Sequence, residues 1–584
     1  MNIQKKDLFS DKIFIKLWAP SMVMAVGLAL GDMADAIVLG QKMGATGLAV
    51  ISLVFPVFMV INVFLYGFGI GGSVKFSKLM GEGKKEEAQA SFNQIFFLNL
   101  IGSIVAALLG ILCITPLLRL LGVGAEDGEI FLACKEYVLV TLAGMPVFFC
   151  SYLMNYYLTN DNKQTLATVG FTIGNVADLL MNIVFVLVFD MGVFGAAIST
   201  VLGQAIAVLI FLPAFLNRNR LLRFRPREIL HIQVGPCLRC FCVGFSSSSA
   251  YVWQFIFVLI INNSLLHHAG ENGVAVFEMV QSVALLVGYL YEYTAKAMQP
   301  VLSTYYGEHN SKGIQYISKK GYRFGSVAGI GFSILLCVFP AFVSRLFGME
   351  GEVLIHMGSQ AIRIYCIGGF VAGISILLQN SFQSCENEKP AFILSTLRSA
   401  VVLIPVALIL VPFGLPALWL FYPITEYLSL FIFFLIARRI KKPEFDEKRI
   451  YSTTIENNMD DFSKLLQEVE SFCEKWETSP RQQFLVSMSV EELCGIIMKR
   501  AFADGAQGYI QITLVALENQ EFELHIRDNA SMFDPLSQKI KKFKKEDTDK
   551  ELDMEAMGVM VVKKKAKDFF YHQYQGFNTI IVRI

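Results

Sequence analysis

LGDMADAIVLG, residues 30–40, and TIGNVADLLMNIVFVLVF, residues 172–189, each place an aspartate inside an apolar run. The two carboxylates are Asp35 and Asp178. A charge at the centre of a bilayer costs about 2.5 to 3.5 kcal/mol on insertion scales, so such residues usually face a cavity and mark an ion or substrate path. The two stretches therefore predict membrane helices that line a transport path.

The composition of the whole chain agrees with a membrane location. Of the 584 residues, 54% are hydrophobic and only 17% are charged, and the mean hydropathy is +0.52. Such a chain is too apolar for a soluble protein with a polar surface. The 50 basic and 49 acidic residues nearly cancel, so nothing in the net charge favours nucleic acid as a partner. The eleven cysteines are scattered and lack the spacing of a secreted disulfide framework.

Twelve apolar stretches are long enough to cross a bilayer as helices, which takes about 20 residues each. Six of them lie near 14–39, 46–73, 91–115, 130–158, 165–189 and 193–216. Six more lie near 240–266, 274–300, 322–346, 355–383, 391–412 and 414–438. The expected fold class is an all-α polytopic membrane protein with twelve transmembrane helices.

Basic residues predict the orientation of these spans in the cell membrane. They crowd the amino terminus, the connections after the second, sixth and eighth spans, and the exit of the last span. The opposite ends of the spans carry few, such as Lys42, Arg119 and Arg345. Because basic residues mark the cytoplasmic side, both termini are expected in the cytoplasm.

The two halves of the membrane region repeat each other at an offset near 225 residues. TNDNKQTLA at 159–167 parallels SCENEKPAF at 384–392, and Gly81 at the end of the second span parallels Gly307 at the end of the eighth. Six spans return the chain to the same side, so the halves are expected to be parallel six-helix repeats that rock against each other. The predicted lobes are residues 1–220 and 221–442.

The composition changes at about residue 450. Apolar residues take helical spacing in MDDFSKLLQEVESFCEKW and in RQQFLVSMSVEELCGIIMKRAF. Alternating segments follow, YIQITLVAL with FELHIRD and then FFYHQYQ with NTIIVRI. Residues 450–584 are therefore expected to form a separate soluble α+β domain that lies in the cytoplasm, because it follows a cytoplasmic exit.

Several segments in order resemble the multidrug and toxic compound extrusion (MATE) family. They are Pro20 fifteen residues before Asp35, GQKMGATGLAVISLVFP at 40–56, and MGVFGAAISTVLGQ at 191–204. The resemblance covers residues 10–440. It implies an antiporter that exchanges external H+ or Na+ for an internal organic compound, typically cationic and amphipathic, by alternating access.

The resemblance also implies a cation site in the amino-terminal lobe. In the proton-coupled branch of the family, a first-span Asp matches Asp35 and a fifth-span polar pair matches Asp178 and Asn182. A fourth-span Asn matches Asn155 and a sixth-span Thr matches Thr200. The family order is Asn and then Asp four residues later, whereas Asp178 precedes Asn182 here. The reversal keeps both residues on one face of the helix but moves the charge by about 6 Å along its axis.

The residues themselves support a proton site. Two carboxylates that face one desolvated cavity cannot both stay ionised cheaply, so the pair can bind and release a proton. Pro20 removes a backbone hydrogen bond from its helix and offers a hinge. The alternative interpretation is that Asp35 and Asp178 are only hydrogen-bonded inside the helix bundle.

Charged residues in the second half of the membrane region give a less specific pattern. Glu278 and Glu426 could hold a sodium ion or a cationic substrate, whereas Glu292 and Lys296 have the spacing of an intrahelical ion pair. Cys237, Cys240 and Cys242 lack a partner His or a second CxxC, so no metal site is predicted. The chain also lacks a GxxxxGK[ST] motif.

The soluble tail resembles the GHKL ATP-binding fold in its anti-sigma-factor kinase form. The matching segments are VEELCGIIMKRAF at 490–502, IRDNASMFDPL at 526–536 and AMGVMVVKK at 556–564. The resemblance gives Asp528 the adenine contact and Gly558 a place in the phosphate-binding glycine box. Ile496 stands at the magnesium-binding Asn, and Ala530 and Ala556 replace two family glycines. Mg2+ demands oxygen ligands, so ATP and Mg2+ are doubtful cofactors. A degenerate regulatory domain, with a possible cytoplasmic protein partner and no enzymatic activity, is expected.

Two alternatives stay open at the level of sequence. A related flippase of lipid-linked precursors would be expected to carry a strongly basic cavity, which the spans lack. A membrane-tethered regulator would use the tail as a nucleotide-dependent serine kinase or a partner-binding module, with the spans sensing a ligand.

Overall fold

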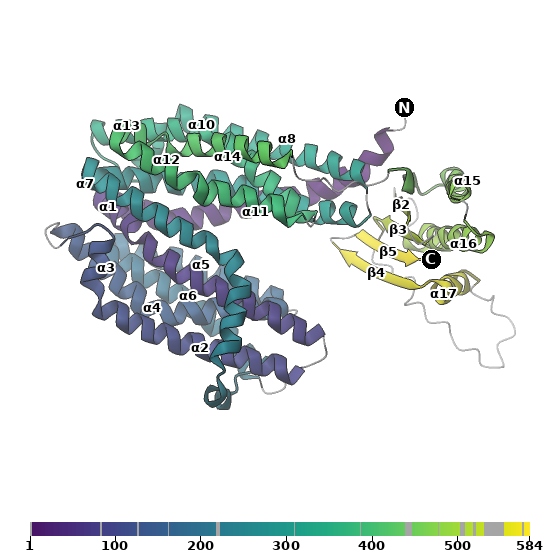
Figure 1. The fold of residues 1–584 in the computed structure, drawn as a ribbon, viewed down its shortest axis with the longest axis horizontal. Helices are drawn as coiled ribbons and strands as arrows, with labels where there is room; N and C mark the ends of the chain where they lie inside the picture. The colour runs from purple at the N-terminus through teal and green to yellow at the C-terminus, as the bar shows by residue number, and fades with distance from the viewer. Residues whose placement is uncertain are drawn as a thin grey trace.

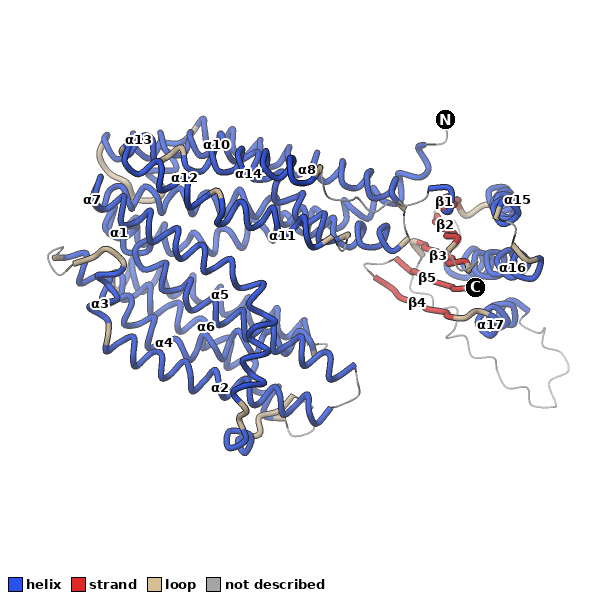
Figure 2. The backbone as a smooth tube through the Cα atoms, viewed as in Figure 1, coloured by secondary structure: helices blue, strands red, loops and turns tan. Residues whose placement is uncertain are grey.

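The computed structural model describes residues 3–81, 85–124, 128–161, 163–217, 222–308, 310–385, 387–438, 447–476, 478–502, 508–517, 521–530, 554–574 and 577–584. Long helices form two lobes, and a smaller domain lies beyond one end of them (Figure 1). Within the described residues, all strands belong to the smaller domain, as the red segments of Figure 2 show. The predicted division into a helical membrane part and an α+β tail is confirmed.

The first half of the membrane part forms the N-lobe. Its helices are α1 (Ile3–Gly81), α2 (Lys85–Leu112), α3 (Ile114–Leu120), α4 (Glu129–Asn160), α5 (Gln164–Asn182) and α6 (Gly192–Leu216). A π-helical segment, Ile183–Val188, extends α5. The short 3-10 helix Pro226–His231 precedes the second half.

The second half forms the C-lobe. Its long helices are α7 (Val234–Gly307), α8 (Ser311–Val338), α10 (Glu352–Ser384) and α14 (Phe421–Ala437). Its shorter helices are α9 (Pro340–Leu346), α11 (Glu388–Thr396), α12 (Leu403–Leu410) and α13 (Leu415–Leu418). The π-helical segment Leu397–Val401 joins α11 to α12, and the 3-10 helix Val411–Phe413 follows α12.

Among the described residues, ten helices are long and apolar enough to cross a membrane. Two of them, α1 and α7, are each a pair of helices joined at a kink. The kinks lie at Gly44 (φ 60°, ψ −138°) and Gly270 (φ 60°, ψ −156°), a backbone conformation that a Cβ atom disfavours. Counting each pair as two helices brings the candidate crossings to the twelve predicted.

The internal repeat is visible in the helix boundaries. Helices α2 and α8 both have 28 residues, α3 and α9 both have 7, and α4 and α10 have 32 and 33. The kinks at Gly44 and Gly270 occupy corresponding places in the two halves. The two lobes are therefore built from one six-helix plan.

Helices α1 and α7 form the seam between the lobes. The start of α1 packs on the C-lobe, where Trp18 Nε1 donates to Thr294 Oγ1 at 3.0 Å. The start of α7 packs on the N-lobe, where a Cβ added at Gly71 would overlap the carbonyl oxygen of Cys240. Each helix therefore crosses from one lobe to the other along its length.

The lobes meet at the end of the bundle that carries the Gly44 kink, here called the Gly44 end. Gln41 Nε2 donates to the carbonyls of Arg345 (2.9 Å) and Leu346 (2.7 Å). Backbones touch there, because a Cβ added at Gly348 would overlap the carbonyl oxygen of Gly40. The lobes diverge toward the end that faces the smaller domain (Figure 1).

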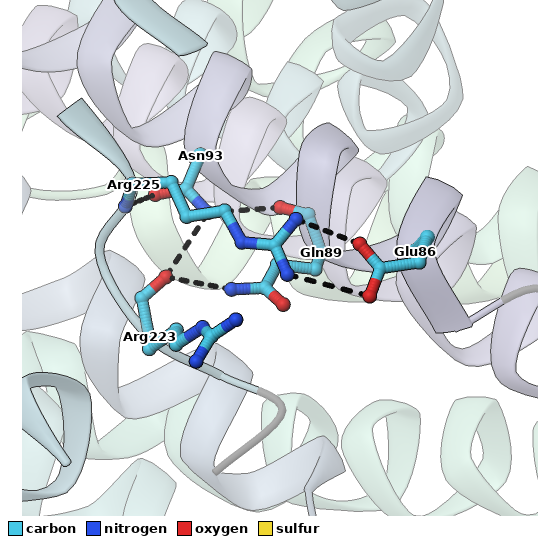
Figure 3. Close-up of polar contacts among 5 residues, drawn as sticks. All are labelled: Glu86, Gln89, Asn93, Arg223 and Arg225. Carbon is cyan, nitrogen blue, oxygen red and sulfur yellow. Dashed lines mark hydrogen bonds and ion pairs between the residues drawn. The ribbon is translucent and has the colours of Figure 1, made fainter. Parts of the chain in front are cut away.

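The connection between the lobes is bound to the N-lobe helix α2 (Figure 3). Arg225 forms an ion pair with Glu86 (2.7 Å), and its backbone N–H donates to Asn93 Oδ1 at 2.7 Å. The side chains of Gln89 and Asn93 both donate to the carbonyl of Arg223, at 3.2 and 3.1 Å. Residues 223–225 of the connector are therefore held on the N-lobe.

The soluble domain is a five-stranded antiparallel sheet of order β1-β2-β3-β5-β4. Its strands are β1 (Ile450–Glu456), β2 (Tyr509–Ala516), β3 (Phe522–Asp528), β4 (Asp568–Tyr574) and β5 (Phe577–Arg583). Its helices are α15 (Met459–Lys475), α16 (Pro480–Ile496) and α17 (Met554–Lys565), and a π-helical segment, Ile497–Ala501, follows α16. Both helices and the four strands predicted from sequence are present, while β1 and α17 were not predicted.

One face of this sheet forms the core of the domain. Ile512 pairs with Ile526, which pairs with Ile580, and these side chains pack with the buried residues Val490 and Leu493 of α16. The alternation of the strands places polar residues on the other face.

Candidate functional site

The N-lobe brings Asp35 and the predicted fifth-span pair together. Asn182, which is fully buried at the end of α5, donates its Nδ2 hydrogen to Asp35 Oδ1 on α1. The partner that lies directly against Asp35 is thus the amide, and Asp178 lies one turn earlier on α5. A carboxylate held by an amide dipole can change its protonation without leaving a bare opposite charge.

Asp178 faces helix α6. The hydroxyls of Ser199 and Thr200 lie beside its carboxyl group, and its Oδ1 atom is buried with no hydrogen-bond partner among the described residues. The missing side chain of Gly203 makes this approach possible, since an added Cβ would lie 2.7 Å from the Cβ of Asp178. The reversed Asp–Asn order therefore places the carboxylate at the α5–α6 contact.

The other predicted N-lobe residues lie on the helices α6 and α4. Thr200 donates to the carbonyl of Ala196 at 3.2 Å in addition to lying near Asp178. Asn155 is half-buried on α4, and its backbone carbonyl accepts from Thr159 at 2.9 Å. Tyr137 on α4 was not predicted; it is 4% exposed and lies within electrostatic range of Asp35, Asp178 and Glu278. No sequence signal marked this position, because a tyrosine in an apolar helix is common.

Glu278 belongs to the seam between the lobes. It is buried on α7 beside the hydroxyls of Ser52 and Ser282. Ser52 also bonds Asn262, since Asn262 Nδ2 donates to the Ser52 carbonyl at 2.6 Å. Glu278 is absent from the described residues that line the C-lobe cavity, whereas Glu426 is among them. The structure thus separates the two glutamates that the sequence offered as one polar site.

Glu426 is paired with an arginine that sequence reasoning missed. Arg398 donates from Nε to Oε2 and from Nη2 to Oε1 of Glu426, both at 2.8 Å. The side chains of Arg398 and Glu426 are 17% and 6% exposed. Arg398 lies in the π-helical segment 397–401, in which Val402 N–H bonds the Leu397 carbonyl at 3.0 Å. Such segments are frequent at functional sites.

The Arg398–Glu426 pair lines a cavity of about 700 Å3 in the C-lobe. This volume is typical of sites for small organic molecules. Its aromatic walls include Tyr365 and Tyr422, whose ring centroids are 4.5 Å apart, and Phe257 with Phe421, 5.3 Å apart. A second cavity, of about 490 Å3, has a nearly all-apolar lining from α1, α2, α3, α4 and α7.

The predicted intrahelical pair is present, with Lys296 Nζ 2.9 Å from Glu292 Oε1. Within the described parts of the chain, no three His, Cys, Asp or Glu residues are grouped so that they could hold a metal ion.

The soluble domain holds Asp528 in a buried position at the end of β3. Its Oδ1 accepts from Asn578 Nδ2 (2.8 Å) and from the backbone N–H of Ala530 (2.9 Å). Burial raises the pKa of Asp528 to about 6, and the bond from Asn578 opposes that rise. Asp528 is 1% exposed and is held by hydrogen bonds within the domain.

The remaining nucleotide features do not fit Mg2+. Ile496 is 1% exposed, and its side chain offers no oxygen to a metal. The Glu492 carboxylate packs against Gly558 in α17, since a Cβ added there would overlap Glu492 Oε2. The side chain of Ala556 lies outside the described residues.

The sequence profile of the MatE family matches residues 20–184 and 244–409, which together form most of the membrane part. The chain belongs to the MatE family. It is therefore a multi-pass membrane protein of a multidrug efflux transporter family. The profile of the histidine kinase-like ATPase domain matches residues 455–584, which is the soluble domain without the first five residues of β1.

Curated MatE relatives are distant in sequence, and the match covers most of their own length. The probable multidrug resistance protein YoeA of Bacillus subtilis is 21% identical over 72% of this chain and 91% of its own. The FAD transporter of Shewanella oneidensis is 21% identical over 74% of this chain and 95% of its own. The multidrug export protein MepA of Staphylococcus saprophyticus is 22% identical over 62% of this chain and 79% of its own.

Solved structures share the fold. The inward-facing conformation of a multidrug resistance MATE family transporter matches with a TM-score of 0.61 and 24% identity, over 70% of this chain and 93% of that chain. The MATE multidrug transporter DinF-BH matches with a TM-score of 0.57 and 28% identity, over 73% of this chain and 95% of that chain.

The ATPase-like domain docks on the cytoplasm-predicted end of the MatE C-lobe. Arg527 on β3 forms an ion pair with Glu308, the residue after α7, and Gln511 Nε2 donates to the Tyr305 hydroxyl at 3.5 Å. The side chains of Arg527 and Glu308 are 9% and 1% exposed. The polar face of the sheet is thus covered by the transporter.

Further polar pairs lie on the same face of the sheet. Arg527 Nη1 also donates to Gln511 Oε1 at 3.2 Å, and burial lowers the pKa of Arg527 to about 10. His525 lies 3.0 Å from Glu523, and this hydrogen bond holds the pKa of Glu523 at about 2, with help from Arg583. The docking contact is therefore polar and buried, and strand β1 also contacts α1.

Proposed function

We propose that this MatE chain is a cation-coupled antiporter, with H+ or Na+ as the coupling ion, that exports an organic, amphipathic or cationic compound by alternating access. The observation that carries the proposal is the course of α1. This helix holds Asp35 against Asn182 of the N-lobe and holds Trp18 against Thr294 of the C-lobe. A cation that binds Asp35 therefore acts on a helix that both lobes share.

The proposed coupling is a local change with two possible arrangements of α1. Protonation or Na+ binding changes the contact between the Asp35 carboxylate and the Asn182 amide. Pro20 lies between Trp18 and Asp35, at a position where α1 lacks one backbone hydrogen bond and can bend. Asp178 with Thr200, and Asn155 on the neighbouring helix, supply the remaining polar groups of the proposed site.

The state described here is closed at the Gly44 end and fits an inward-facing transporter. The contacts of Gln41 with Arg345 and of Gly40 with Gly348 join the lobes at that end. The orientation that basic residues predict makes the Gly44 end external, which leaves both termini and the ATPase-like domain in the cytoplasm.

The coupling proposal predicts that Asp35→Asn and Asp178→Asn each lower transport at least tenfold, since a neutral amide cannot exchange a proton or neutralise Na+. The measurement is uptake of ethidium by inverted vesicles, driven separately by a pH gradient and by a sodium gradient. Asp190→Asn is the matched control, because Asp190 is a surface residue paired with Lys42 at 2.8 Å. Full transport by both site variants would contradict the proposal.

We propose in addition that the ATPase-like domain regulates transport and does not hydrolyse ATP. Its support is the docking contact: Arg527 holds the end of α7 at Glu308 while β1 contacts α1. A domain that binds both helices of the seam restrains their movement. A serine kinase in this position would need a Mg2+ ligand where Ile496 stands.

The regulatory proposal predicts that Arg527→Gln increases the transport rate severalfold at equal protein level, because the freed domain no longer restrains α1 and α7. Arg583→Gln is the control; Arg583 pairs with Glu523 on the same sheet but is 45% exposed. A rate equal to or below wild type in Arg527→Gln would contradict the proposal.

A further inference from the structure

The C-lobe cavity has charges that cancel. Arg398 is bonded at two points to Glu426, and the other carboxylate on its wall, Glu292, is bonded to Lys296. Two unit charges 4 Å apart interact by about 4 kcal/mol near a protein surface. A ligand with a lone positive charge would therefore gain from Glu426 about what it loses to Arg398, and a lone negative charge would do the reverse.

Carboxamides are the main polar groups that remain. Five of them line the cavity, from helices α7 and α10 of the C-lobe: Gln254, Gln281, Gln379, Asn380 and Gln383. Each carboxamide both donates and accepts hydrogen bonds, so the wall can donate to carbonyl oxygens and accept from ring N–H groups of a ligand. Surface charge is not needed for such recognition.

Two lining groups have unused hydrogen-bonding capacity in this structure. The Gln281 Nε2 atom and the Thr425 hydroxyl are buried with no hydrogen-bond partner among the described residues. Thr425 is only 2% exposed, so it cannot be satisfied by open solvent. A buried donor without a partner costs about 1 to 3 kcal/mol, which a ligand that fills the cavity would recover.

Aromatic side chains form much of the cavity wall. Tyr365 with Tyr422 and Phe257 with Phe421 are packed as ring pairs, and Trp419 lines the same space. Ring faces held by neighbouring rings are suited to stacking on a planar ligand.

We infer that this cavity is the cargo site and that it takes a planar heteroaromatic compound of no net charge that carries carbonyl and ring-nitrogen groups. The Arg398–Glu426 pair forms a charge-neutral part of the wall, and Gln281 and Thr425 supply hydrogen bonds to the ligand. This inference rests on the proposed exporter function and names the cargo class for it.

The test is ligand binding to the purified full-length chain in detergent at pH 7. The probes are riboflavin, an uncharged three-ring compound with ring carbonyls; flavin mononucleotide, which has the same ring and a phosphate; and the planar cation ethidium. Riboflavin is expected to bind at least tenfold more tightly than the other two. Tighter binding of either charged probe, or no riboflavin binding up to its solubility limit, would overturn the inference.

Matched variants locate the site. Thr425→Val and Gln281→Leu are expected to weaken riboflavin binding about fivefold each, the effect of one lost hydrogen bond. Ser429→Ala is the control: Ser429 lies one turn after Thr425, and its hydroxyl is also buried without a partner among the described residues, but it does not line the cavity. An equal loss in Ser429→Ala, or no loss in both lining variants when they elute as folded protein, would overturn the assignment.

Failure of this inference is distinguishable from failure of the coupling proposal. Binding in detergent requires no ion gradient, so Asp35→Asn is expected to bind riboflavin as wild type does while losing transport. Loss of riboflavin binding in Asp35→Asn alone would place the ligand in the N-lobe and overturn the C-lobe assignment.

Discussion

The two lobes share one helical plan but hold their buried carboxylates in different ways. In the N-lobe, Asp35 lies against the amide of Asn182, and Asp178 lies beside the hydroxyls of Ser199 and Thr200. In the C-lobe, Glu426 is held by the guanidinium of Arg398 at two points. The same fold therefore supports dipolar partners in one repeat and an ionic partner in the other.

This difference teaches which carboxylate can change its charge. A carboxylate held by dipoles can be neutralised at small cost, because no opposite charge is left behind. A carboxylate held by a buried arginine cannot, since its neutralisation leaves the guanidinium unpaired. Both cases recur at the soluble domain: Asp528 within it is bonded to Asn578, and Glu308 of the membrane part is paired with Arg527 at the docking contact.

The largest expected effect on stability comes from breaking the Arg398–Glu426 ion pair. Arg398→Gln leaves Glu426 buried without its cation, which is expected to cost about 3 to 5 kcal/mol of stability. The measurement is thermal unfolding of the purified chain in detergent, followed by tryptophan fluorescence. The double variant Arg398→Leu with Glu426→Leu is the control and should recover most of the loss, because no charge remains. Equal stability of Arg398→Gln and wild type would show that the pair is not ionic.

Asp528→Asn in the soluble domain is expected to have a smaller effect on stability, and to raise it. Because the folded pKa of Asp528 is about 6 and its ordinary value is 3.8, the folded state keeps the proton longer than the unfolded state. The wild type therefore loses stability as pH rises from about 4 to 6, and Asp528→Asn removes this loss. The variant should be more stable at pH 7 by about 3 kcal/mol, since each pKa unit corresponds to about 1.4 kcal/mol.

The check on Asp528 is urea unfolding of the full chain at pH 4.5 and pH 7, with a signal from the soluble domain. Glu523→Gln is the comparison, because the pKa of Glu523 is held at about 2. The stability from Glu523 is fully present above its ordinary pKa and is lost as pH falls toward 2. A gain from Asp528→Asn that is equal at both pH values would contradict the titration.

The smallest effect is expected at the exposed ion pair of the connector. Glu86 is 79% exposed in its pair with Arg225, and exposed pairs contribute little. Glu86→Gln should leave the unfolding temperature unchanged within error, because the bonds of Gln89 and Asn93 to Arg223 still hold the connector (Figure 3). Gln89→Ala with Asn93→Ala is the comparison that should lower it. A clearly lower unfolding temperature in Glu86→Gln alone would contradict the expectation that exposed ion pairs contribute little to stability.

Local sequence pattern predicted most of the elements. Long apolar runs predicted the membrane helices, and alternation predicted β2 to β5. Strand β1, with the sequence IYSTTIE, was missed because its burial comes from tertiary contacts: pairing with β2 and packing on α15 and α1. Helix α17 was missed because Gly558 lies inside it, a residue that disfavours helix and packs here against Glu492.

The candidate sites show a similar limit. Asp35, Asp178 and Asn182 stood out in the sequence because charge is rare in apolar helices, and two of the three lie in direct contact. Arg398 gives the same signal within an apolar run and could have been found by it. The pairing of Arg398 with Glu426 could not, because the two residues lie 28 positions apart on different helices. The docking of Arg527 on Glu308 gave no signal, since both residues are ordinary surface types.

The sequence by itself determined the membrane location, the two repeats, the soluble tail and the presence of costly charges in apolar helices. These follow from composition and period, which are local properties. Only the tertiary structure decided which partner each charge has: an amide for Asp35, an arginine for Glu426 and a distant glutamate for Arg527. The physical reason is that the energy of a buried charge depends on the few groups within hydrogen-bond distance, and helix packing chooses those groups.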